Sequence, residues 1–174
     1  MEFPMRCLAL LVFSLSLSAP AMAEPDFSQL SRADALERYE EVSVAMTEAS
    51  MLMYTRVDPS LDEVLGDPEW DEVDREAAEC VYDTYKESGD LELLEDVISA
   101  TEDLTDLIRE DESIDMLAVI KGDISETLLK PDLAPADEER NMEVTLECDV
   151  IEANQRRLNM SELMPRLMAL AEAS

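Results

Sequence analysis

The chain has 174 residues, of which 43 are Asp or Glu and 13 are Lys or Arg, and it contains no His. A net charge of −30 repels nucleic acid and anionic lipid headgroups. The lack of His excludes His general bases, His-ligated zinc and the histidine-containing di-iron and haem-attachment motifs. With 3 Gly and 5% aromatic residues, the composition also disfavours a phosphate-binding glycine loop and an extensive sheet.

Residues 1–23 have the three parts of a secretory signal peptide. Arg6 precedes an apolar run over residues 7–17, which is too short to anchor a chain in a bilayer. Ala21-Met22-Ala23 then supplies the small residues of a cleavage site. The alternative, a buried N-terminal helix, is disfavoured because such a helix would not end in this small-residue pattern. We therefore expect export and a mature chain, 24–174, that forms a single acidic helical domain without a membrane span. The expected location is the periplasm in a Gram-negative bacterium and the extracellular space otherwise.

Two cysteines, Cys80 and Cys148, remain after the signal peptide is removed. An even number of cysteines in an exported chain predicts a disulfide, and the alternative is two separate buried thiols. A redox-active pair is not expected because the chain has no C-x-x-C motif. Glu79 and Glu147 also precede the two cysteines, and a neighbouring anion raises the pKa of a thiol.

The first predicted helix covers residues 32–55 and begins after Ser31. Apolar residues recur there at alternating spacings of four and three between Ala35 and Met53, which is the pattern of one helix face. A connector follows over residues 58–67, with one short turn at 60–65.

The second predicted helix covers residues 68–88. Its start is indicated by the Asp-Pro pair at 67–68, because Asp is a favoured cap and Pro a favoured first helical residue. Gly89 is expected to end it. Asp90 then caps a third helix, whose apolar stripe runs over residues 91–108.

A break at 110–113 leads to a shorter predicted helix with apolar residues between Ile114 and Leu128, which Gly122 is expected to divide. Residues 130–135, with two prolines, form the clearest linker.

The next predicted helix covers residues 136–158, and its inward side chains recur every three or four residues: Val144, Cys148, Ile151, Gln155 and Leu158. Ser161 caps a last helix that ends near Ala173, with Pro165 in its first turn. The sequence thus predicts an all-α, up-and-down bundle of five or six helices with one interhelical disulfide, Cys80–Cys148. That disulfide would make the helices at 68–88 and 136–158 neighbours.

Acidic residues are concentrated in two segments, 58–79 and 87–115, and each segment contains a single basic residue, Arg75 or Arg109. The simplest interpretation is a solvated helix surface that keeps the protein soluble. A second is a docking face for a basic partner. A third is an irregular cation site around Gly66, since no segment matches a calcium-binding loop; its ligands would be Asp58, Asp62, Glu63 and Asp67.

Methionines form two clusters, one at Met51 and Met53 and one along the last helix at Met160, Met164 and Met168. Thioethers can bind Cu(I), but methionine also fills helical cores and adaptable interfaces. We therefore expect packing and keep copper binding as the alternative.

The segment Gln155–Ser174 has a net positive charge, owing to Arg156, Arg157 and Arg166. We expect it to dock on acidic helices of its own chain. The alternative is docking on a second copy, which would make a homo-oligomer through the C-terminal helix.

No motif identifies a catalytic, cofactor-binding or metal-binding residue. We therefore expect an exported non-enzymatic helical protein that acts through protein–protein contact, with its acidic surface against a basic partner surface. A module that binds a metal or ligand through Met or carboxylate groups is one alternative. A carboxylate-dependent hydrolase is the other, because paired carboxylates can hydrolyse glycosides.

Overall fold

The structure, a computed structural model, describes residues 27–129 and 133–173; the expected signal peptide at 1–23 lies outside them. The predicted all-α class is confirmed, because the described ranges contain helices and no strand. The α-helices in these ranges are α1 (Arg32–Val57), α2 (Glu72–Ser88), α3 (Leu91–Glu110), α4 (Met116–Lys121), α5 (Pro135–Glu147), α6 (Val150–Arg157) and α7 (Met160–Ala173). Three short 3₁₀ helices join them: η1 (Phe27–Gln29), η2 (Pro59–Glu63) and η3 (Glu126–Leu129).

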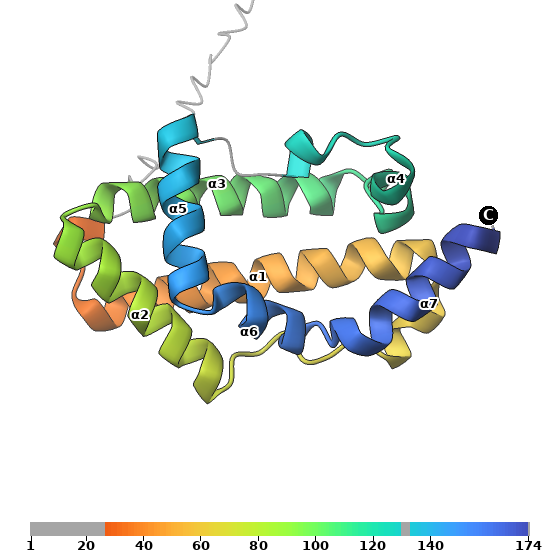
Figure 1. Cartoon of the computed structure of the whole chain (residues 1–174), viewed down its shortest axis with the longest axis horizontal. Helices are drawn as coiled ribbons and strands as arrows, with labels where there is room; N and C mark the ends of the chain where they lie inside the picture. Colours follow the sequence, from red (N-terminus) through yellow and green to blue (C-terminus); the bar gives the residue numbers. More distant parts are fainter. Residues whose placement is uncertain (1–26, 130–132, 174) are drawn as a thin grey trace, which may run out of the picture.

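The longest helix, α1, is the centre of the fold (Figure 1). It packs along α3, which runs in the same direction, while α2 lies beside one end of this pair and leads into the start of α3. The second half of the chain then crosses this layer, with α5 and α6 against α2 and α7 beside the end of α1. None of the helices in the described ranges has both the length and the apolar character needed to cross a membrane.

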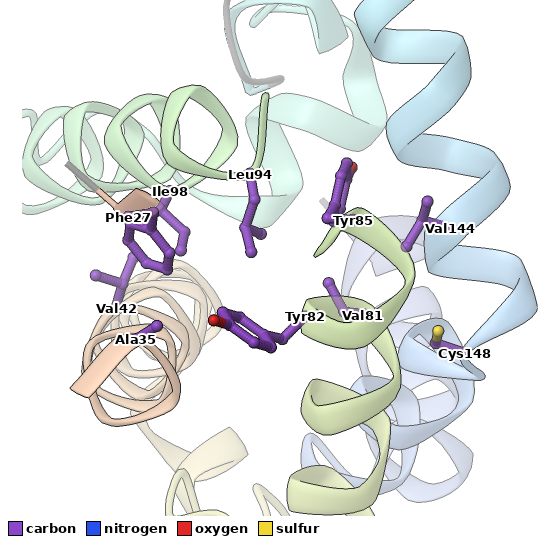
Figure 2. Close-up of a cluster of buried hydrophobic side chains, with 10 residues drawn as sticks. All are labelled: Phe27, Ala35, Val42, Val81, Tyr82, Tyr85, Leu94, Ile98, Val144 and Cys148. Atoms are coloured by element: carbon purple, nitrogen blue, oxygen red, sulfur yellow. The ribbon is translucent and has the colours of Figure 1, made fainter. Parts of the chain in front are cut away.

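Three clusters of buried apolar side chains hold the helices together, and α1 contributes to all three. The first cluster joins η1, α1, α2, α3 and α5, with Tyr82 and Tyr85 of α2 between the helices on either side (Figure 2). The second joins α1 to the ends of α3 and α4, and the third joins α1 to η2 and α7. This arrangement explains why α1 buries residues along its whole length.

The start of α2 differs from the prediction. The helix begins at Glu72 rather than at residue 68, and its cap is Asp71 rather than Asp67. Asp71 accepts hydrogen bonds from two backbone N–H groups, while Asp74 accepts one from the backbone of Asp71, which completes a capping box. This reciprocal cap satisfies more backbone donors than Asp67, which accepts one bond from the Glu69 N–H.

The predicted helix between Ile114 and Leu128 is also shorter than expected. The predicted division at Gly122 is confirmed: α4 ends there, because the φ of 77° at Gly122 lies in the left-handed region that glycine adopts at low cost, and only the short η3 follows. Leu128 consequently lies outside the core, with 48% of its surface exposed.

The predicted helix 136–158 is interrupted after Cys148, because Asp149 adopts a left-handed φ of 56°. Because of this interruption, α6 presents to the core a different set of side chains from the one that a continuous helix would present. Ile151 and Gln155 are therefore exposed, contrary to prediction, and Ala153 and Arg157 are buried in their place.

The last helix begins at Met160, so Ser161 lies inside it and is not its cap. Asn159, with a left-handed φ of 54°, separates it from α6. Pro165 lies within the helix, beyond the first turn where we expected it. Leu163 and Leu167 of this helix are fully buried against η2 and α1.

Candidate functional site

The predicted disulfide is present between Cys80 of α2 and Cys148 at the end of α5, with the two Cα atoms 5.6 Å apart. It confirms that the helices carrying these cysteines are neighbours. The bridge lies at the point where α5 gives way to α6. Its role is therefore to hold this junction against α2.

The basic C-terminal segment docks on acidic residues of its own chain. Arg156 forms ion pairs with Asp71 and Asp74 at the start of α2, and its Nη2 lies 3.0 Å from Asp71 Oδ1. Hydrogen bonding to Arg156 holds the pKa of Asp71 far below its ordinary value. Further along, Arg166 lies 4.0 Å from Glu63 of η2.

Arg157 differs from its neighbours because it is buried, with 7% of its surface exposed. Its Nη2 donates to Ser43 Oγ of α1 at 3.2 Å and to Asn154 Oδ1. Its Nε and Nη1 are also buried, and neither has a hydrogen-bond partner among the described residues. Burial lowers the pKa of this guanidinium. From the sequence, Arg157 was expected only to belong to the basic C-terminal segment, and the inward residues predicted around it, Gln155 and Leu158, did not include it.

The acids proposed as a cation site take part in local turns. Asp58 accepts the Ser60 N–H at 2.8 Å, and Asp67 accepts the Glu69 N–H at 3.0 Å. Glu63 forms an ion pair with Arg166. Throughout the described part of the chain, no group of three or more acids or cysteines is arranged to hold a metal ion.

The methionines are distributed between separate clusters. Met53 is buried in the second core cluster, whereas Met160 and Met164 pack against the third. Met160 Sδ also lies 3.7 Å from the hydroxyl of Tyr54. Met168, in contrast, is 45% exposed. Met160 and Met164 of the last helix thus pack against the core while remaining partly exposed.

The acidic segment 87–115 contributes to a groove of about 640 Å³ along the outer face of α3. Three carboxylates line it: Asp96 and Asp103 of α3 and Asp137 in the first turn of α5. The remaining lining is mostly apolar and consists of Ala100, Leu104, Leu107, Leu128, Leu133 and Ala134, together with Ser99. Asp96 and Asp103 are separated by two helical turns, roughly 10 Å along the axis.

The groove carboxylates have no counter-ion within the chain as described. No ion pair joins Asp96, Asp103 or Asp137 to a basic residue in the described ranges. Arg38 and Arg109, which reach α3 or belong to it, pair with Glu102 and Glu48. The arrangement combines uncompensated negative charge with exposed apolar surface, which suits a ligand that is both cationic and apolar.

The acidity of this segment is evident from the sequence, but the groove is not. Exposed Leu128 belongs to the short η3, and Leu133 and Asp137 come from the far side of the linker. These residues contact the same groove as α3 only in the folded chain. Residue spacing along the sequence does not predict that contact.

Comparison of the chain with protein families, with curated proteins and with solved structures finds no match in any of the three.

Proposed function

We propose that this is an exported, non-enzymatic protein that binds a basic, amphipathic segment of a partner protein in the groove along α3. The single observation that carries the proposal is that three carboxylates without an ion pair among the described residues, Asp96, Asp103 and Asp137, line the same groove as an apolar floor, formed by Leu104, Leu107, Leu128 and Leu133. Acidity elsewhere on the surface keeps the protein soluble and attracts the same partner from a distance.

Electrostatics supports this choice of partner. The net charge of −30 attracts cations, but at physiological salt the attraction is screened beyond about 8 Å. Selectivity must therefore come from local contacts. Basic side chains spaced by two helical turns would meet Asp96 and Asp103 together, since these residues have that spacing.

The apolar floor adds the second requirement. Leu107 is partly exposed and Leu128 is 48% exposed, so both offer surface that a partner can remove from water. Small side chains at Ser99 and Ala100 leave room between the two acids of α3. A partner segment with apolar residues between its basic ones fits this pattern, whereas a uniformly charged polycation does not use the floor.

Export is part of the proposal and rests on the signal-peptide pattern of residues 1–23. The mature protein would begin at Glu24, in the periplasm or outside the cell. The Cys80–Cys148 disulfide fits such an oxidising compartment. N-terminal sequencing of the exported protein tests the cleavage site, and a start at Met1 in the extracytoplasmic fraction would refute it.

The groove can be tested with a synthetic amphipathic Lys/Leu peptide as the probe, and with the same peptide carrying Glu in place of Lys as the charge-reversed probe. We expect the Lys/Leu peptide to bind with a Kd of roughly 1 μM and the Glu peptide not to bind. Asp96→Asn/Asp103→Asn should weaken binding roughly tenfold at about 0.15 M salt. Isothermal titration calorimetry measures both effects.

The matched control is Asp106→Asn/Glu110→Gln, which makes the same change in net charge on α3 outside the groove lining. This pair should change the affinity by less than about threefold. Equal weakening by the two pairs would mean that the probe responds only to total charge, and the groove proposal would fail. Affinity capture from the native compartment at low and high salt, with mass spectrometry, then identifies the natural partner.

Self-association through α7 stays a separate prediction. The helix docks on its own chain through Leu163 and Leu167, but Met168 on its outer side is exposed. Sedimentation velocity of the wild-type protein and of Met168→Glu tests whether two copies meet there.

A further inference from the structure

Helix α5 crosses α3 and brings Asp137 into the acidic groove, but it buries little of its own surface (Figure 1). Of the 13 residues of this helix, only Val144 is buried. Met142 and Leu146, by contrast, are 50% and 60% exposed. Apolar packing along the helix therefore contributes little to holding α5 in this position.

The disulfide is what fastens α5 to α2, because Cys148 is the last residue of the helix and Cys80 lies on α2. Two polar contacts add to it. Asn141 accepts a hydrogen bond from the hydroxyl of Tyr85 at 3.1 Å, and Arg140 lies 3.9 Å from an aspartate at the start of α3. Both partners of that ion pair are partly exposed, so it adds little stability.

The bend after α5 opposes the local preference of the chain. Asp149 has a φ of 56°, in the left-handed region that glycine adopts more readily than residues with a Cβ atom. Its side chain does not cap α6, so the first N–H groups of that helix receive no hydrogen bond from it. An unbroken helix would satisfy those groups and would match the apolar spacing of the sequence, which runs through Val144, Cys148, Ile151, Gln155 and Leu158.

Helix α6 is anchored more firmly than α5. Its Ala153 and Arg157 are buried, and its Arg156 forms ion pairs with Asp71 and Asp74 of α2. If the bend straightened, α6 would therefore keep its place and α5 would move into line with it.

We propose that the Cys80–Cys148 disulfide is a redox latch on the acidic groove, which holds α5 across α3 against the tendency of residues 135–157 to form one helix. When a small dithiol reduces the bridge, the bend at Asp149 straightens and α5 carries Asp137 out of the groove. The effect on binding rests on the groove function proposed above.

The reduction is an ordinary thiol–disulfide exchange. The dithiol supplies two electrons and two protons: the Cys80–Cys148 bond breaks, two cysteine thiols form, and the dithiol closes into its own cyclic disulfide. Cys80 is only partly buried, which gives a small reductant a route to the bridge. The cysteines are not a redox catalyst in this scheme, because the electrons come from outside the protein.

Amide hydrogen exchange, followed by ¹H–¹⁵N NMR with and without dithiothreitol, tests the latch directly. In a continuous helix, the N–H groups of Val150, Ile151 and Glu152 bond to carbonyls four residues earlier. We expect reduction to slow their exchange at least about tenfold while the amides of α1 and α3 stay protected. Unchanged or faster exchange at these three amides, or loss of protection in α1 and α3, would overturn the proposal.

Two variants separate the latch from other effects of the reductant. Cys80→Ser/Cys148→Ser should show the slowed exchange without dithiothreitol and should not respond to it. Asp149→Gly favours the left-handed bend and disfavours a helix through this position, so its exchange should change by less than about twofold on reduction. If the Ser variant does not fold, reduced wild-type protein and reduced Asp149→Gly still decide between a straightened and a bent chain.

Calorimetry with the Lys/Leu peptide then tests the effect on the groove. Reduction should weaken binding to the wild-type protein roughly fivefold, and binding to Asp149→Gly by less than about twofold. Slowed exchange with unchanged peptide affinity would show that the latch does not control the groove, which would overturn this inference. If the oxidised protein does not bind the peptide at all, the groove function fails, and amide exchange still decides whether the disulfide holds the bend.

Discussion

The carbonyl oxygen of Arg157 lies so close to the Cα atom of Gly66 that a Cβ atom on residue 66 would overlap it. The connector before α2 therefore passes directly against the junction between α6 and α7. Asn159 strengthens this contact by donating from its Nδ2 to the carbonyl of Val64 at 2.8 Å. Glycine is required at position 66 by this close approach and not by its φ angle.

The first prediction concerns that contact. Gly66→Ala should lower the free energy of unfolding by about 1–3 kcal/mol, because the backbones must separate to admit a methyl group. Urea unfolding followed by circular dichroism measures the change. Glu69→Ala, an exposed substitution in the same connector, should have little effect; similar losses in the two variants would show that the Gly66 contact is not the cause.

The second prediction concerns the disulfide. It joins residues 68 positions apart, and a loop of this length is expected to contribute roughly 4 kcal/mol in the chain-entropy model. Cys80→Ser/Cys148→Ser should therefore lower the stability by about 2–5 kcal/mol. Guanidinium unfolding provides the measurement. Thiol titration of the denatured wild-type protein is the check on pairing, since two free thiols in the unreduced protein would contradict the bridge.

The third prediction concerns pH and the Arg156–Asp71 ion pair. The folded-state pKa of Asp71 is lowered by its bond to Arg156, so the pair stabilises the fold above the ordinary Asp pKa of about 4. This stabilisation should be lost as the pH falls from about 4 through the folded-state value. Arg156→Gln should therefore reduce Tm at pH 7 and have a progressively smaller effect in acid.

Arg166→Gln is the matched control, since Arg166 also carries one positive charge but lies 4.0 Å from Glu63. Its effect at neutral pH should be smaller than that of Arg156→Gln. If the Arg156→Gln effect stays constant down to pH values well below 4, the ion pair does not lower the pKa of Asp71.

The fourth prediction concerns alkaline pH. Tyr85 is fully buried, and burial raises its pKa to about 12, above the value of about 10 in the unfolded chain. The folded state then holds the hydroxyl proton of Tyr85 more tightly than the unfolded chain does. The contribution of protonated Tyr85 to the free energy of unfolding is therefore complete below pH 10 and is lost as the pH rises towards 12. Tyr85→Phe should reduce the loss of stability over that range. A spectrophotometric tyrosinate titration that shows every tyrosine ionising near pH 10 in the folded protein would contradict it.

Local patterns in the sequence were sufficient for the helical class and for much of the core. The spacing from Ala35 to Met53 identified the buried face of α1, and the stripe over 91–108 identified that of α3. The pairing of Cys80 with Cys148 followed from an even cysteine count. These features depend on residue spacing and composition, which are properties of the chain itself.

The start of α2 is a local feature, whereas the interruption after α5 depended on tertiary structure. Asp67 and Asp71 are both acceptable caps by residue type, but only Asp71 has an acid three residues later, Asp74, with which it forms a capping box. The interruption at Asp149 occurs where the disulfide and the α2 contact hold the chain, and no glycine or proline marks it. Once that turn is made, Arg157 faces inward and Ile151 outward, which reverses the pattern expected for a continuous helix.

Composition alone established that the protein is strongly acidic and lacks histidine chemistry, since charge and residue type need no coordinates. Tertiary structure decided where charge is left uncompensated. Asp96 and Asp103 of α3 meet Asp137 of α5 in one groove, and none of the three forms an ion pair with a described basic residue, whereas Arg38 and Arg109 pair with Glu102 and Glu48. The same packing buries Arg157, whose Nε and Nη1 have no hydrogen-bond partner among the described residues. Both arrangements arise from contacts between residues distant in sequence, which is why only the folded chain reveals them.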